Sequence, residues 1–183
     1  MICTALQLFQ GLPCSNTYDS DDWYTPPGYI EAARGVMGGI DLDPASSELA
    51  QGIVKADNYF SKAINSLHQP WHGRVWLNPP YSMPGRFIGK LISEYLDRRV
   101  DQAIILVNND SDTGWFHDLL NAATAVCFTR GRIQFLSPIR AGKSGPRQGQ
   151  AFFYFGSSAA LFSESFQAIG KVIFLADAAP TNN

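Results

Sequence analysis

Four consecutive residues near the middle of the chain, Asn78-Pro79-Pro80-Tyr81, combine backbone and side-chain groups that suit chemistry on an amine. Two consecutive prolines remove two backbone donors and fix two φ angles, so the carbonyls of Asn78 and Pro79 become free acceptors in a stiff loop. The side-chain oxygen of Asn78 adds another acceptor. A cluster of acceptors with few donors favours the binding of a planar amine that carries two N–H groups.

Such a cluster would also promote reaction of that amine. The exocyclic nitrogen of adenine is a poor nucleophile because its lone pair is delocalised into the ring. Acceptors on both N–H groups stabilise the positive charge that develops as this nitrogen attacks a sulfonium methyl, mainly in the transition state. Tyr81 offers a flat face to an extruded base, worth about 1–3 kcal/mol, against a flipping cost of roughly a few kcal/mol. The plainer alternative is that Pro-Pro after a strand forms only a rigid turn.

The elements around this motif predict its place in a fold. Val75-Trp76-Leu77 is typical of a strand that ends at the motif. Ala103–Val107 is a continuous apolar run, which indicates a strand buried on both faces. Because ligands bind at the carboxyl ends of the strands in open parallel sheets, the motif stands where a site is expected. The helix between these strands is amphipathic, with apolar pairs one turn apart at Phe87, Ile88, Leu91, Ile92, Tyr95 and Leu96.

The rest of the chain also alternates between helices and strands, which predicts an α/β fold with a mainly parallel sheet. An antiparallel hairpin over 132–155 is expected to close one edge of this sheet. We expect a single domain over 23–183, after a loosely attached leader over 1–22. Thr25 and Pro26 suit the start of a helix that ends at Gly38-Gly39. The other predicted strands are 40–43, 125–128, 132–136, 152–155 and 172–175, and the other helices lie near 47–56, 115–120 and 161–169.

Charged residues are segregated along the chain. Asp41 and Asp43 lie two residues apart on one predicted strand, and we expect one of them to face a pocket at its end while the other caps a helix or meets solvent. The stretch 128–150 contains no acid, and we expect its basic residues to contact a DNA backbone rather than to form only a solvated loop. Asp112, Thr113 and Trp115 suit either a helix start or a ligand-facing site. The basic residues expected to bind DNA are Arg132, Arg140, Lys143 and Arg147.

The composition fits one globular domain: 183 residues, 45% hydrophobic and 16% charged, with a formal net charge of −2. That charge argues against a protein that coats polyanions, although local patches still allow an enzyme that acts on nucleic acid. The three cysteines show no disulfide or metal spacing and no stretch has a membrane-spanning length, so we expect a cytoplasmic protein. We expect no metal site, because the three histidines are scattered, and no thiolate nucleophile, because Cys127 lies in an apolar strand.

An ordered series of motifs resembles the phage-type DNA adenine-N6 methyltransferases, the Dam family. The resemblance implies a Rossmann-like class I fold that uses S-adenosylmethionine and acts on double-stranded DNA, in a bacterial cell and encoded by a phage or prophage. It implies that Asn78, Pro79, Pro80 and Tyr81 form the catalytic loop. The motifs are Asp22-Trp23-Tyr24-Thr25-Pro26, Asp41-Leu42-Asp43-Pro44-Ala45, Trp71 before the Asn-Pro-Pro-Tyr loop, Asp112-Thr113-Gly114-Trp115-Phe116-His117 and Gly131-Arg132-Ile133-Gln134-Phe135.

The same resemblance implies the cofactor pocket, although the FxGxG loop common to many class I methyltransferases is missing from this chain. The residues implied to line the pocket are Tyr24, Thr25, Pro26, Asp41, Asp43, Pro44 and Ala45. Two alternatives stay open at this point. One is another amino-group methyltransferase, acting on cytosine N4, RNA adenine or a protein glutamine. The other is a catalytically silent DNA-binding relative. The DNA recognition sequence and the oligomeric state do not follow from the sequence.

Overall fold

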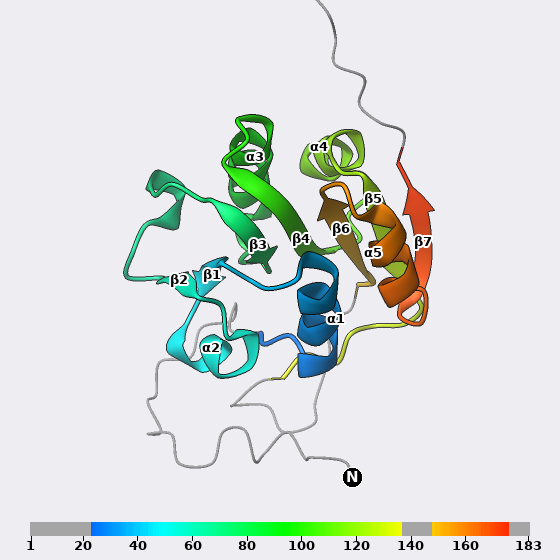
Figure 1. Cartoon of the computed structure of the whole chain (residues 1–183), viewed down its shortest axis with the longest axis horizontal. Helices are drawn as coiled ribbons and strands as arrows, with labels where there is room; N and C mark the ends of the chain where they lie inside the picture. The colour runs from blue at the N-terminus through cyan, green and yellow to red at the C-terminus, as the bar shows by residue number, and fades with distance from the viewer. Residues whose placement is uncertain (1–22, 137–147, 176–183) are drawn as a thin grey trace, which may run out of the picture.

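Seven strands form one sheet: β1 (Leu42–Ser46), β2 (Asn58–Ser61), β3 (Gly73–Leu77), β4 (Val100–Asn108), β5 (Ala125–Thr129), β6 (Gln150–Phe155) and β7 (Gly170–Phe174). The structure is a computed structural model that describes residues 23–136 and 148–175. The strand order in the described residues is β2-β1-β3-β4-β6-β5-β7 (Figure 1). β2, β1, β3 and β4 pair in parallel, whereas β6 is antiparallel to β4 and β5, and β7 is antiparallel to β5. Strands β1 to β5 therefore share one direction, which confirms the predicted α/β class with a mostly parallel sheet.

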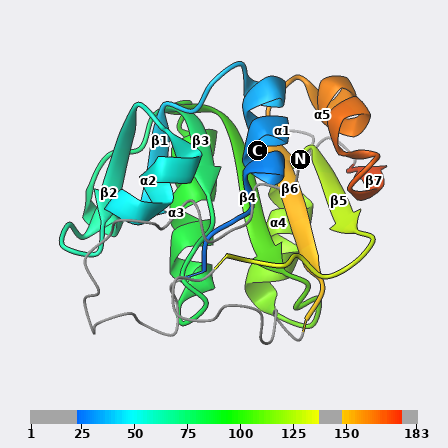
Figure 2. The same ribbon diagram turned by 90° about the horizontal axis from the view of Figure 1, so that it is seen from below.

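Helices cover both faces of this sheet (Figure 2). Helices α1 (Pro27–Met37), α2 (Glu48–Val54) and α5 (Ala159–Phe166) pack on one face, and α3 (Pro84–Leu96) and α4 (Gly114–Ala122) pack on the other. On β4, Ile104 and Leu106 belong to the first core, while Ile105 and Val107 belong to the second. This alternation explains why the sequence of β4 is continuously apolar rather than two-sided.

Two helices follow the sequence pattern closely. Helix α1 ends as predicted at Gly38, whose φ of 75° is left-handed and whose N–H donates to the Arg34 carbonyl. Its N-cap is Pro26 rather than Thr25, and no side chain caps it. In α3 the predicted apolar face is buried at Phe87, Ile88 and Leu91 and partly buried at Ile92 and Tyr95, but its last member, Leu96, is 67% exposed. Glu94 is buried on that helix instead.

The predicted strand over 132–136 is wrong. Residues 132–135 belong to no strand, and Leu136 forms only an isolated bridge to Tyr24, with N···O distances of 3.0 and 2.8 Å. Both edges of β5 are already taken by β6 and β7, so this segment cannot pair with β5. The Ile133 N–H is satisfied by the side-chain oxygen of Gln150, at 2.9 Å. The antiparallel pairs of the sheet are β4–β6, β6–β5 and β5–β7 instead.

Other boundaries differ by less. The first strand covers Leu42–Ser46 instead of 40–43, and β2 has no counterpart among the predicted strands. The predicted leader, residues 1–22, lies outside the described residues. Within the part of the chain that the structure describes, no helix is long and apolar enough to cross a membrane.

Candidate active site

A cavity of about 890 Å³ opens at the carboxyl ends of β1 and β3. These strands are neighbours in the sheet, but the chain first turns from β1 to β2 on one side and only then crosses to β3 on the other. Such a reversal of strand order leaves a crevice where α/β proteins bind ligands. The volume falls in the range of small-molecule sites, about 300–1,000 Å³. The lining residues are 23–25, 43–50, 53, 54, 60–67, 76, 78–83, 86 and 87.

All four residues of the Asn-Pro-Pro-Tyr loop line this cavity, directly after β3 ends at Leu77. The Asn78 Nδ2 donates to the Trp23 carbonyl at 3.3 Å. A carbonyl only accepts, so this contact fixes which end of the amide is nitrogen. The Asn78 Oδ1 is left buried, and no donor among the described residues reaches it. A buried acceptor without a donor is uncommon in a folded protein and indicates that a ligand supplies the missing N–H or O–H.

The backbone of the loop adds a second acceptor. The Pro80 carbonyl accepts from the Met83 N–H at 3.2 Å, which closes the turn before α3. The Pro79 carbonyl accepts no hydrogen bond from the described residues, and Pro79 itself is buried. Since a proline at position 80 has no N–H, the loop has few donors of its own near these acceptors. The arrangement therefore matches the acceptor-rich corner expected from the sequence.

Aromatic rings flank the loop. Tyr81 and Trp23 both line the cavity, and each meets the Phe135 ring edge to face, at centroid distances of 6.4 and 6.5 Å. Such pairs are worth about 0.5–1.5 kcal/mol each beyond the area they bury. Phe135 thus ties the segment before residue 137 to both walls of the cavity. The sequence placed Phe135 in a motif but gave it no role.

Asp43 is the buried acid of the cavity, with only 3% of its surface exposed. Its carboxylate accepts from the Ala45 N–H at 3.3 Å and from the Gln51 amide at 3.1 Å, and no cation pairs with it in the described residues. Burial raises the pKa of Asp43 to about 6, against smaller opposing effects of hydrogen bonds from Ser46, Ala45 and Gln51. A carboxylate held in this way is costly to ionise and is positioned to accept further donors.

Asp41 lies at the opposite end of the strands and does not line the cavity. Its carboxylate accepts from the Arg74 guanidinium Nε at 2.9 Å and from the Arg74 backbone N–H at 2.7 Å. A second guanidinium nitrogen pairs with the other oxygen. The side-chain hydrogen bonds from Arg74 hold the pKa of Asp41 below its usual range, against the opposing effect of burial. Of the two alternating aspartates, the structure places Asp43 at the cavity and gives Asp41 to an ion pair.

Comparison with known proteins decides the family. A family described as "DNA N-6-adenine-methyltransferase (Dam)" matches residues 14–177. The chain belongs to the Dam family. A protein of Escherichia phage T1 named DNA N-6-adenine-methyltransferase is 34% identical over 116 residues, which cover 61% of this chain and 47% of that protein. A protein of the same name from Haemophilus phage HP1 is 34% identical over 128 residues, covering 67% and 72%.

The match to the phage T1 protein spans about half the length of that relative. Among solved structures, a METTL16 MTase domain superposes with a TM-score of 0.39 and 10% identity, covering 70% of this chain and 66% of that one. The resemblance noted from the sequence motifs is confirmed at the level of the Dam family.

Most of the cofactor-pocket residues implied by the Dam resemblance meet at the cavity. Tyr24, Thr25, Pro44 and Ala45 line it together with Asp43, whereas Pro26 caps α1 and lies outside the lining. Several lining residues had no predicted role, among them Trp76, Lys62 and Arg86. Trp76 lies in the run that predicted β3. The two cations resemble ordinary solvated side chains in the sequence, so no local signal singled them out.

The residues expected to contact DNA in this Dam-family chain are placed only in part. Arg132 is exposed and does not line the cavity. Arg140, Lys143 and Arg147 lie outside the described residues.

The Asp112–Trp115 motif of the Dam resemblance starts a helix. Thr113 precedes α4, and its hydroxyl donates to the Asp110 carbonyl at 2.8 Å. The Trp115 ring meets Phe116 edge to face at 5.8 Å. Trp115 also lines a small cavity of about 20 Å³ with Pro79 and Tyr81. Of the two alternatives for this motif, the structure therefore favours the helix start, with Trp115 packed beside the loop.

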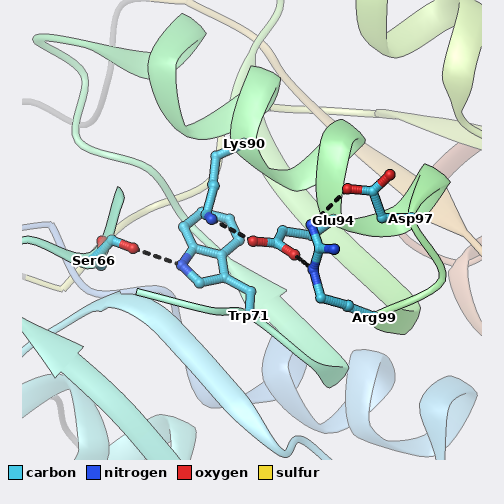
Figure 3. A network of polar contacts seen from close by, with 6 residues as sticks. All are labelled: Ser66, Trp71, Lys90, Glu94, Asp97 and Arg99. Atoms are coloured by element: carbon cyan, nitrogen blue, oxygen red, sulfur yellow. Dashed lines mark hydrogen bonds and ion pairs between the residues drawn. The ribbon is translucent and has the colours of Figure 1, made fainter. Parts of the chain in front are cut away.

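A saturated polar network supports another wall of the cavity (Figure 3). The Trp71 indole N–H donates to the Ser66 carbonyl at 2.9 Å, and Ser66 lines the cavity. On the other side of Trp71, Glu94 is 2% exposed and pairs with both Lys90 and Arg99. Burial alone would raise the pKa of Glu94, but the hydrogen bonds from the two cations outweigh it, so the pKa is lowered. Of the residues in this network, only Ser66 lines the cavity, so the charged groups lie behind its wall.

Cys127 is buried in β5, and burial raises the pKa of its thiol to about 11. A thiol of that pKa supplies almost no thiolate at neutral pH. Among the described residues, no three His, Cys, Asp or Glu side chains gather in a way that would hold a metal ion.

Proposed function

We propose that this chain transfers a methyl group from S-adenosylmethionine to the N6 amine of adenine in double-stranded DNA. Membership of the Dam family and the names of the two phage relatives support this activity. The observation that carries the proposal is the buried Asn78 Oδ1, which has no donor among the described residues and stands in a cavity at the carboxyl ends of β1 and β3. An exocyclic amine supplies the donor that this oxygen lacks.

The two acceptors of the loop match the two N–H bonds of that amine. We assign one hydrogen to the Asn78 Oδ1 and the other to the Pro79 carbonyl, which also accepts nothing from the described residues. As the nitrogen attacks, its lone pair leaves the ring and positive charge develops on it. Both oxygens then interact more strongly than in the ground state, so the interaction raises turnover rather than affinity. The Tyr81 ring supplies a surface on which the base can stack.

The opposite half of the cavity fits S-adenosylmethionine. When bound, this group supplies a methyl on a sulfonium, which an amine attacks directly without a covalent enzyme intermediate. Asp43 is a buried carboxylate with no cation partner in the described residues, so it suits the ammonium or the ribose hydroxyls of such a ligand. Tyr24, Thr25, Pro44 and Ala45 are proposed to complete this half.

The target base must leave the duplex to reach these groups. The Asn78 Oδ1 is buried inside the cavity, and a base that is still stacked and paired cannot approach it. The DNA backbone is then held outside the cavity, and we assign this contact to Arg132, Arg140, Lys143 and Arg147. Neutralising Arg140, Lys143 and Arg147 is expected to weaken DNA binding and flatten its salt dependence. Since DNA is the proposed partner, we place the protein in the bacterial cytoplasm, encoded by a phage or prophage.

Product analysis tests the proposed function. Unmethylated duplex DNA is incubated with the chain and S-adenosylmethionine, digested to nucleosides and analysed by mass. We expect N6-methyldeoxyadenosine to appear with time and enzyme. Methyl groups on cytosine N4 would overturn the proposal, as would methylation of RNA or of a protein glutamine with none on DNA. DNA binding without any transfer would identify a silent relative.

A further inference from the structure

Two cations stand where the cavity meets solvent. Lys62, after β2, and Arg86, in the first turn of α3, both line the cavity and are both exposed. The third charged residue of this mouth is Glu48, which begins α2 directly after the strand of Asp43. The basic residues therefore lie on the segments beyond β2 and beyond the Asn-Pro-Pro-Tyr loop, and the acid lies on the Asp43 side.

The Arg86 guanidinium differs from the other arginines that lie near acids. Arg34, Arg74 and Arg99 each pair with an aspartate or glutamate. The Arg86 side chain has no hydrogen-bond or ion-pair partner among the described residues, and Arg86 lines the open cavity. A planar guanidinium of this kind suits a phosphate, which it can bind through two parallel hydrogen bonds.

The backbone at the start of α3, around Arg86, is also electrostatically positive. Helix α3 is 13 residues long, its N-cap Met83 provides no side-chain cap, and its first turn contains no acid. The positive end of this helix is therefore not neutralised by the protein. Asn78 provides the second, independent sign of a ligand, because its buried Oδ1 lacks a donor in the same cavity.

We infer that Arg86, with Lys62, binds the phosphates of the extruded nucleotide. A nucleotide whose base amine is held at Asn78 has its sugar and phosphates at the outer end, where the cavity opens and these cations lie. The contact forms fully only after the base has left the stack, so it favours extrusion rather than general attachment to the duplex. This inference rests on the proposed function, since it takes the base-binding corner as its reference point.

The test compares Arg86→Gln with Lys171→Gln, which removes an exposed cation on β7 at the other end of the sheet. Affinity is measured by fluorescence anisotropy over a range of salt concentrations, and extrusion by the fluorescence of 2-aminopurine at the target position. We expect Arg86→Gln to weaken DNA binding roughly 5–10-fold and to reduce the log–log salt slope by about 1. At saturating DNA it should also lower the 2-aminopurine signal. Cofactor affinity and melting temperature should stay at wild-type values, and Lys171→Gln should change none of these quantities.

Lys62→Gln is expected to change affinity and salt slope in the same direction. The inference is overturned if Arg86→Gln binds and extrudes like Lys171→Gln. It is also overturned if Arg86→Gln weakens DNA binding while the 2-aminopurine signal at saturation stays unchanged, because the cation would then contact the duplex generally. Failure of the proposed function would appear separately, as wild-type chain that produces no methyladenine.

Discussion

Asp41 and Asp43 are two residues apart on the chain, one just before β1 and one within it, yet their surroundings are opposite. Asp41 is paired with Arg74 through two guanidinium nitrogens and a backbone N–H, and its pKa is lowered. Asp43 is buried without a cation in the described residues, and its pKa is raised to about 6. The first carboxylate is satisfied by the protein, and the second has capacity left for a ligand.

The same contrast separates Glu94 from Asn78. Glu94 is buried but paired with both Lys90 and Arg99, and it does not line the cavity. Asn78 is anchored through its nitrogen to Trp23 and keeps its oxygen without a donor in the described residues. The Glu94 carboxylate is satisfied by the protein and supports the fold, whereas the Asn78 amide keeps an acceptor available at the cavity. The comparison predicts that substitutions of the two kinds separate stability from function.

The largest functional loss is expected for Asn78→Ala. Removing an acceptor that acts mainly on developing charge should lower kcat by on the order of 10²–10³-fold. The dissociation constant of S-adenosylmethionine, measured by calorimetry, should stay within about twofold, since the change is confined to the loop. Asn121→Ala, an exposed position on α4, serves as the matched control. Loss of cofactor affinity with near-normal turnover would contradict the role assigned to Asn78.

Asp43→Asn is expected to affect binding and stability in opposite directions. Cofactor affinity should fall roughly tenfold, because a hydrogen bond to a charged group is lost. The folded pKa of Asp43 lies above the unfolded value of 3.8, so ionisation destabilises the wild-type fold as pH rises from there to about 6. Asparagine does not ionise, so the variant should gain melting temperature relative to wild type over that interval.

Cofactor binding to wild type should weaken as pH falls below about 6, and binding to Asp43→Asn should not depend on pH in that range. Titrations at several pH values check both statements. Equal pH profiles for the two proteins would show that Asp43 does not meet the cofactor as a carboxylate.

Asp41→Asn is expected to change stability alone. Breaking the half-buried pair with Arg74 should cost about 1–2 kcal/mol in the free energy of unfolding at neutral pH, measured with urea. The pKa of Asp41 is lowered in the folded state, so this contribution is present above the unfolded value of 3.8 and is lost as pH falls through the folded value. The difference between variant and wild type should therefore shrink in acid. A specific loss of cofactor affinity in Asp41→Asn would erase the distinction between the two aspartates.

The smallest effect is expected for Tyr81→Phe. Stacking on a base requires the ring and not the hydroxyl, so kcat/KM on DNA should stay within about twofold of wild type. Tyr81→Ala removes the ring and should lose about 1–3 kcal/mol of base binding. Steady-state kinetics on one oligonucleotide compares the three proteins. A large defect in Tyr81→Phe would assign the hydroxyl a part in the reaction.

Sequence patterns predicted the helices and strands whose buried faces repeat regularly along the chain. The apolar run of β4 and the paired apolar residues of α3 correspond to elements in the structure, because burial on a face repeats at the period of the element. β2 escaped prediction because Asn58–Ser61 is a short edge strand with exposed residues and no clear alternation. The segment 132–136 alternates like a strand, but the two edges of β5 were already occupied by β6 and β7.

Site residues were also predictable where their role depends on adjacent residues, and not where it depends on contacts with distant parts of the chain. The Asn-Pro-Pro-Tyr loop was visible because its acceptors depend on adjacent residues. The sequence indicated a pocket role for one of the two aspartates, but the choice between them depends on Arg74, which lies 33 residues from Asp41 in the sequence. The position of Arg86 at the cavity depends on how the fold brings α3 and the segment after β2 to the same cavity, so no local pattern in the sequence indicated it.

The insertion of β6 between β4 and β5 has a consequence for synthesis on the ribosome. β4 ends at Asn108, but the strand that covers its open edge begins only at Gln150. At about 5–20 residues per second, β4, whose centre is buried and apolar, leaves the ribosome several seconds before its partner. During that interval the nascent chain presents an unpaired hydrophobic edge, which is the kind of surface that chaperones bind and that aggregates form from. A chain that stalls or is truncated before residue 150 should therefore be insoluble even though the whole catalytic loop has been made.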